Sequence, residues 1–178
     1  MKKIKKLLIL CMLVGSVMFS LNAVSQNGNS ALTDPEIASI AVVANQNDID
    51  FAEIAMDRSE NKEVLGLART MASDHQMVID RAVELVTRLG VTPEDNAVSQ
   101  QLVKDAEAAQ EKLREESEAE FDRTYVNNEV EYHQKVIAAV ESLLVPQAQN
   151  EELKALLEEV VPVLKGHLEH AQMIQKNL

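Results

Sequence analysis

Apolar residues recur four and then three positions apart along four stretches of the chain, a spacing typical of the buried face of a helix in a bundle. The four series are Ile37, Ala41, Ala44, Asp48, Phe51 and Ala55; Val64, Ala68, Met71, His75, Val78, Ala82, Leu85 and Leu89; Val126, Glu129, His133, Val136, Val140 and Leu143; and Leu153, Leu157, Val160, Leu164, His167, Ala171, Ile174 and Leu178. No stretch alternates with a period of two over a useful length, so we expect no strand. The pattern predicts an all-α protein.

Capping and helix-ending residues set the limits of these helices. The segment 33–36 (T-D-P-E) is a capping box with an early proline, Asn61 can cap the second helix, and Gly90 can end it. A second capping box at 117–120 precedes the helix that carries His133; Pro146 is expected to end that helix, and Asn150 begins the last one. The four long helices are expected over residues 34–59, 62–89, 118–144 and 151–176.

A shorter and richly charged helix is expected from the segment 92–95 (T-P-E-D) to about residue 115. It lies between the second and third long helices. The predicted architecture is a four-helix bundle with an extra shorter helix inserted there, in one domain that spans residues 34–178.

The first residues are typical of a signal peptide. Four lysines in 2–6 precede an apolar run from Leu7 to Phe19, and Ala23-Val24-Ser25 offers small residues for cleavage before Gln26. A retained membrane anchor is the alternative, but the run is short for a stable span. We therefore predict a signal peptide over 1–25, a flexible lead-in over 26–33, and a location in the periplasm or cell envelope with no stable membrane span after processing.

The composition narrows the choice of partners and of chemistry. Removal of residues 1–25 leaves 13 basic and 29 acidic residues, a formal net charge of −16. Such an acidic chain repels nucleic acid, so no nucleic-acid partner is expected. The single cysteine, Cys11, lies in the predicted leader, so the rest of the chain has no disulfide or thiolate chemistry.

Candidate chemistry lies where polar residues interrupt the apolar series. His75, His133 and His167 each interrupt a different helix, and Glu129 lies one turn before His133. The first helix adds Asp48, or Asp50 if the buried face is broad. Counted from the turns between the helices, these positions fall at similar heights along antiparallel hairpins. Three histidines and a carboxylate suit one transition-metal ion, such as Zn²⁺, Fe²⁺, Cu²⁺ or Mn²⁺.

Two interpretations of this layer remain open on the residues alone. The first is a metal site formed by His75, His133, His167, Asp48 and Glu129. The second is a structural polar layer, in which the buried histidines pair with carboxylates or with the two tyrosines of the chain. His170, one turn beyond His167, is expected on the flank of the buried face and partly exposed.

Three motifs in order resemble one known family. They are M-A-S-D-H at 71–75, F-D-R-T-Y at 121–125 followed by a histidine at 133, and P-V-L-K-G-H-L at 162–168. The pattern is similar to the exported bacterial family called domain of unknown function 4142, which is grouped with ferritin-like bundles. The resemblance covers about residues 34–176 and implies a ferritin-like four-helix bundle in the periplasm or envelope. It also implies that the family's histidine positions fall on His75, His133 and His167, and its acidic position on Asp48 or Asp50.

The chain departs from the true ferritins at the residues that would bridge two irons. A di-iron centre needs a Glu-x-x-His pair on each of two helices. Ala72, Val130 and Leu164 stand three residues before the three histidines. We therefore expect no di-iron centre and at most one mononuclear site.

The sequence favours an exported, non-catalytic bundle of the cell envelope that can hold one metal ion in the His/carboxylate layer. Two alternatives differ in class. One is a metal-dependent redox enzyme of oxidative defence, so whether the protein is an enzyme stays undecided. The other is a protein-interaction module, with a protein partner or a second copy of the chain bound at the charged helix near residues 93–115.

Overall fold

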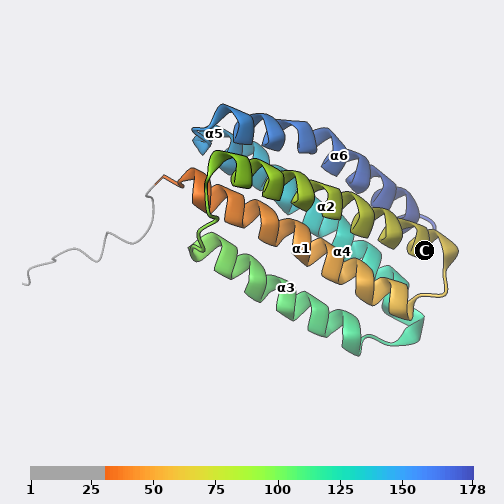
Figure 1. The fold of residues 1–178 in the computed structure, drawn as a ribbon. Helices are drawn as coiled ribbons and strands as arrows, with labels where there is room; N and C mark the ends of the chain where they lie inside the picture. Colours follow the sequence, from red (N-terminus) through yellow and green to blue (C-terminus); the bar gives the residue numbers. More distant parts are fainter. Residues whose placement is uncertain (1–30) are drawn as a thin grey trace, which may run out of the picture. The chain divides into compact units, whose positions relative to one another are not determined.

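The computed structural model describes residues 31–178, and within this range the secondary structure is helical without any strand (Figure 1). The elements are α1 (Asp34–Arg58), α2 (Lys62–Leu89), α3 (Ala97–Glu115), α4 (Glu118–Ala139), the π-helical turn η1 (Val140–Leu144), α5 (Val145–Gln147) and α6 (Glu151–Gln175). The all-α prediction is confirmed. The predicted signal peptide and most of the lead-in lie outside the described residues.

The four long helices α1, α2, α4 and α6 form the bundle, and α3 is the predicted extra helix (Figure 1). α1 packs most extensively on α2, and α4 packs on α6, so the bundle consists of two helical hairpins. α3 lies along α1 and touches α4 only sparingly. The chain therefore brings one face of each long helix to a common interior.

Most of the predicted caps are present. The capping box at Thr33 forms on both sides, and Asn61 and Asn150 each accept hydrogen bonds from backbone N–H groups of the next helix. Gly90 ends α2 with φ 65°, a left-handed conformation that glycine adopts without a Cβ clash. The helix limits are therefore set locally, by side chains that satisfy the terminal N–H groups.

One predicted helix start is wrong, and one predicted capping box does not form. The segment 92–95 does not begin the third helix: Asn96 caps it and α3 starts at Ala97. The cause is tertiary, because the Glu94 N–H donates to the Pro35 carbonyl and the Asn96 amide donates to the Glu36 carbonyl, which fastens this loop to the start of α1. Ser117 precedes α4 as expected, but its side chain makes no capping hydrogen bond.

The predicted helix end at Pro146 is also wrong. The helix runs on through the π-helical turn η1 and the short α5 to Gln147, so Pro146 lies in its last turn. In η1 the Val145 N–H donates to the Val140 carbonyl, five residues earlier. One turn of α4's continuation is thus wider than a regular α-helix.

The core has two parts that differ in composition. The part beside the α1–α2 turn, called here the aromatic half, contains Phe51, Phe121, Tyr125 and Met71, each at most 1 % exposed. The part toward the other end, called here the aliphatic half, has no aromatic residue in its buried cluster. That cluster consists of Ile37, Ile40, Ala82, Leu85, Ile137, Val140, Leu144, Leu153, Leu156, Leu157, Val160 and Leu164.

A search of the described helices for membrane spans finds none with the length and hydropathy to cross a bilayer.

Candidate metal site

Five titratable side chains are buried in one layer of the bundle. Asp48 comes from α1, His75 from α2, Glu129 and His133 from α4, and His167 from α6. Their exposed fractions run from 0 % for Asp48 and Glu129 to 6 % for His167. The structure therefore brings together all five residues that the sequence predicted for this layer. Asp50, the alternative to Asp48, instead accepts hydrogen bonds from Gln46 and Gln110.

The three imidazole rings lie against one another. Their centroids are 5.6 Å apart between His75 and His133, 5.3 Å between His75 and His167, and 5.5 Å between His133 and His167. One ring nitrogen from each histidine lies within 4.8 Å of a nitrogen of the other two. Nitrogens this close can converge on one ion at Zn–N or Cu–N bond lengths of about 2 Å after small side-chain rotations.

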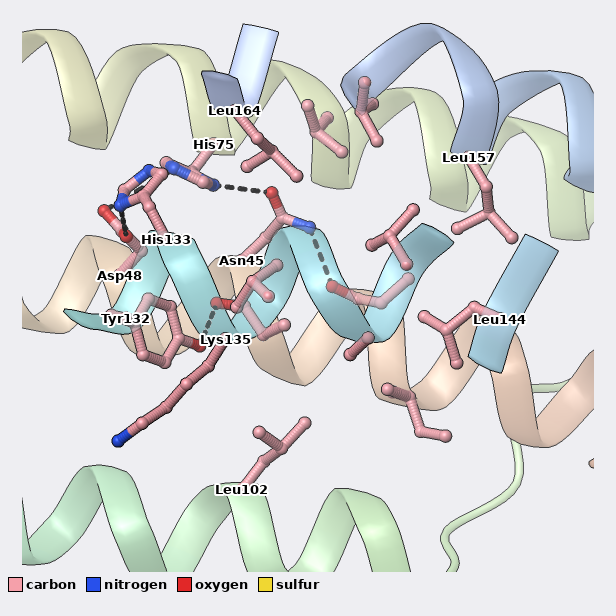
Figure 2. Close-up of a pocket in the computed structure, with 18 of the residues that line it drawn as sticks. Asn45, Asp48, His75, Leu102, Tyr132, His133, Lys135, Leu144, Leu157 and Leu164 are labelled. Atoms are coloured by element: carbon pink, nitrogen blue, oxygen red, sulfur yellow. Dashed lines mark hydrogen bonds and ion pairs between the residues drawn. The ribbon is translucent and has the colours of Figure 1, made fainter. Parts of the chain in front are cut away.

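Each imidazole uses one nitrogen for a hydrogen bond inside the protein. His75 Nδ1 lies 2.7 Å from the Asn45 side-chain oxygen, His133 Nδ1 lies 3.0 Å from the Glu129 carbonyl, and His167 Nε2 lies 3.0 Å from an Asp74 carboxylate oxygen. All three partners are acceptors, since the Asn45 amide nitrogen is itself a donor to the Ala41 carbonyl. We therefore assign the proton of each neutral ring to the nitrogen that faces its acceptor (Figure 2 shows the His75–Asn45 pair).

The second nitrogen of each ring is left with a free lone pair. His75 Nε2, His133 Nε2 and His167 Nδ1 are all buried without a hydrogen-bond partner. A buried polar atom without a partner is costly, so three of them in one layer require an explanation. A fixed N–H on one side and a free lone pair on the other is the arrangement of a metal-binding histidine with its outer-shell partner.

The two carboxyl groups lie against the histidines on the α1 and α4 side. Asp48 Oδ1 is 3.6 Å from His75 Nε2, and Asp48 Oδ2 is 3.7 Å from His133 Nδ1 (Figure 2). Glu129 Oε2 is 3.7 Å from His133 Nδ1. All four carboxyl oxygens are buried without a hydrogen bond. Ligand atoms of Asp48, Glu129 and His133 also lie within 4.8 Å of one another and form a second group, which shares His133 with the group of three histidines.

Burial shifts the pKa values of Asp48, Glu129, His75 and His133 toward the neutral form. Burial raises the pKa of Asp48 to about 8, and burial together with the Asp48 charge raises the pKa of Glu129 well above its usual value. Burial lowers the pKa of His75 to about 3, helped by the charges of His133 and His167. Burial likewise lowers the pKa of His133 to about 4, against the opposing effect of its hydrogen bond to the Glu129 carbonyl. Without a cation, the two carboxyl groups, His75 and His133 are therefore mostly uncharged near neutral pH.

The two tyrosines and His170 have different surroundings. The Tyr132 hydroxyl donates to the Ala44 carbonyl at 2.7 Å (Figure 2). The Tyr125 hydroxyl is buried without a partner, and burial, followed by the charges of Glu129 and Asp48, raises its pKa. His170 is partly exposed, as predicted.

The sequence analysis missed Asn45 and Asp74, the two side chains that orient His75 and His167. Both had a local cue. Asn45 stands three residues before Asp48, on nearly the same face of α1, and Asp74 directly precedes His75 within the M-A-S-D-H motif. Polar residues are common at such positions on helix surfaces. Only the position of the partner histidine on another helix shows that Asn45 and Asp74 each orient an imidazole.

Comparison with known proteins identifies the family. The model of the family described as domain of unknown function 4142 matches residues 20–174. The chain belongs to this family. No curated protein matches the chain.

Two solved structures are similar to the bundle. A DUF305 fragment from Deinococcus radiodurans superimposes with a TM-score of 0.70 at 16 % identity, covering 84 % of this chain and 100 % of that one. CopM in the Cu(II)-bound form superimposes with a TM-score of 0.62 at 18 % identity, covering 82 % of this chain and 98 % of that one. At these identities the likeness establishes a shared helical fold.

The buried carboxyls predict how the stability of the metal-free protein depends on pH. Above pH 6.5 the histidines of the unfolded chain lose their protons and contribute little further to the pH dependence. In the folded protein Asp48 and Glu129 are still protonated, whereas in the unfolded chain the same two carboxyl groups are ionised. The folded state then binds more protons, so the free energy of unfolding falls as pH rises. We expect a loss of about 2 kcal/mol between pH 6.5 and 8, at up to ~1.4 kcal/mol per pH unit for each group.

Urea unfolding in the presence of a chelator measures this slope. Asp48→Asn should reduce it, because the amide does not titrate, and the exposed Asp80→Asn should leave it unchanged. A wild-type stability that is flat or rises over this range would show that the carboxyls are already ionised in the folded protein.

Proposed function

We propose that this protein binds one divalent transition-metal ion between its four long helices, through His75, His133 and His167 together with Asp48 and Glu129. It acts as a metal-binding protein of the cell envelope. The observation that carries the proposal is the state of the three imidazoles: each is oriented by an acceptor on one nitrogen and has a buried, unpartnered lone pair on the other.

The ligand set favours a borderline metal ion. Imidazole nitrogens with carboxylate oxygens suit Zn²⁺ and Cu²⁺, and among first-row divalent ions the affinity of such a site rises to Cu²⁺. The fold of CopM in the Cu(II)-bound form, which resembles this bundle, supports a copper ion as the first candidate to test. The main support for a metal ion comes from this chain's own donor atoms, the imidazole nitrogens and carboxyl oxygens of the layer.

The protonation of the layer makes metal binding sensitive to pH. His75 and His133 are already neutral and need lose no proton, because burial lowers their pKa values to about 3 and 4. Asp48 and Glu129 carry protons near neutral pH and release them when a cation arrives. Binding therefore releases protons from the carboxyls and tightens as pH rises.

The first test compares thermal unfolding of the wild type and His167→Ala, each with Cu²⁺ or Zn²⁺ and with chelator. We expect the metal to raise the wild-type melting temperature and the chelator to remove the gain, because an ion that binds only the folded state stabilises it. His167→Ala should lose most of this metal-dependent shift, and metal analysis of the wild type should find close to one equivalent.

His170→Ala is the matched control, because His170 lies one turn further along α6 and outside the cluster. It should keep the full metal-dependent shift. A wild-type melt that ignores both metal and chelator would refute the proposal, and the layer would then be a structural polar network.

A second test addresses the outer shell. Asn45→Ala removes the acceptor that holds His75 Nδ1–H, so the ring is free to turn its lone pair away. We expect metal affinity to fall by about 10–100-fold, measured by competition with a chelator of known affinity. Asn47→Ala is the control, since it also removes an amide hydrogen bond, to the Leu102 carbonyl, but orients no histidine. Equal affinities in the two variants would contradict the assigned role of Asn45.

The proposed location rests on residues 1–25 and has its own test. We expect the mature protein to be recovered outside the cytoplasm with an N-terminus near Gln26, because the basic segment and the apolar run direct export and cleavage. Cell fractionation followed by N-terminal sequencing measures both. Full-length chain retained in the inner membrane would contradict the prediction.

A further inference from the structure

A partly open cavity of about 310 Å³ adjoins the His/carboxylate layer. Asp48, His75, His133 and His167 form part of its wall, and the rest is mostly aliphatic side chains from the aliphatic half of the core. Figure 2 shows Leu144 and Leu157 on the side of this space away from His75 and His133, and Leu164 also lines it. A cavity of this size is at the lower end of the range for small-molecule binding sites, about 300–1,000 Å³.

The cavity follows from how the two halves of the core are filled. Phe51, Phe121, Tyr125 and Met71 fill the aromatic half, and its most buried side chains are 0–1 % exposed. The aliphatic half contains only Ile, Leu, Val and Ala, and several of its residues keep 5–9 % exposure. Because cores normally pack without voids larger than a water molecule, an apolar space this large is unusual unless something occupies it.

The backbone beside the cavity is also irregular. Val140 and Leu144, the first and last residues of the π-helical turn η1, both line it. A π-helical turn is less stable than a regular helix and is found mostly at functional sites. The widened turn therefore lies where a ligand would contact α4 and its continuation.

The charges around the cavity limit the head group that such a ligand can carry. Asp74, Asp105 and Glu131 line it, and Lys135 is the only lysine or arginine among the lining residues. The exposed Asp105 and Glu131 face this space from α3 and α4, the two helices that touch only sparingly, and so mark its opening. An anionic head group would meet a surplus of carboxyl groups there.

We propose that this cavity binds an unbranched aliphatic molecule with an uncharged head group. A cavity of about 150 Å³ accommodates the six carbons of benzene, so one of about 310 Å³ has room for about ten to twelve carbon atoms. The head group lies toward the opening or the histidine layer, and the chain lies among Leu144, Leu157 and Leu164. This proposal does not depend on a bound metal.

A series of 1-alkanols from hexanol to tetradecanol tests the proposal, with chelator present so that no metal contributes. Methyl NMR reports where each alcohol binds, and the titration gives its affinity. We expect shifts at Leu144, Leu157 and Leu164 and none at Leu67 or Leu113 of the aromatic half. Each added carbon should tighten binding about fourfold, until the cavity is full at about ten to twelve carbons.

Three results would overturn the proposal. The first is the absence of any binding by 1-decanol or 1-dodecanol. The second is an affinity that keeps rising through tetradecanol, which indicates partition onto a surface and not a closed space. The third is tighter binding of decanoate than of 1-decanol, which would refute the uncharged head group.

Variants that fill the cavity provide an independent check. Ala82→Leu adds volume inside it, so we expect 1-decanol to bind at least about tenfold more weakly while the protein stays folded, because the new side chain occupies empty space. Ala139→Leu fills it from α4 and decides the question if Ala82→Leu does not fold. Ala138→Leu, the exposed neighbour on the same helix, is the control and should bind as the wild type does. Equal binding in all of these variants would show that the alcohol lies elsewhere.

Discussion

Three histidines and two carboxyl groups are buried in the middle of this bundle, and most of their polar atoms have no hydrogen-bond partner inside the protein. Each such atom costs on the order of 1–3 kcal/mol, so the layer is an expensive part of the core. Two features reduce the cost. Burial keeps the two carboxyl groups, His75 and His133 in their neutral forms. In addition, each of the three imidazoles has one nitrogen hydrogen-bonded to an acceptor. A cation in the layer would satisfy the remaining lone pairs together.

The rest of the structure maintains the register that this layer needs. The aromatic half packs tightly beside the layer, and Arg58 joins the ends of α1 and α3 there. Its guanidinium donates hydrogen bonds to the carbonyls of Leu113, Arg114 and Glu116. The same guanidinium lies 4.5 Å above the Phe121 ring. At the other end the Asp34 carboxylate accepts from the backbone N–H groups of Gln149 and Asn150, which ties the start of α1 to the start of α6. Helices fixed at both ends hold their buried residues at constant heights.

The layer also separates two kinds of packing. On one side the large aromatic side chains leave little space, and on the other the aliphatic side chains leave the cavity. The histidines thus have a rigid support behind them and an apolar space in front. This asymmetry supplies what a binding site requires, because ligands must be held in place by ordered side chains and still have room to enter.

The sequence by itself determined the helical class, the four long helices and four residues of the layer, with the fifth at Asp48 or Asp50, because periodicity and capping are local properties of the chain. Asp48, His75, Glu129, His133 and His167 were recognisable as polar interruptions of apolar series. The tertiary structure alone decided between Asp48 and Asp50, and it moved the start of α3 to Ala97 through the contacts of its loop with α1. It also assigned Asn45 and Asp74 to their histidines and left the cavity in the aliphatic half. These features depend on contacts between side chains of helices that are far apart in the sequence. No local sequence pattern therefore predicts the orientation of an imidazole ring or the volume left between packed residues.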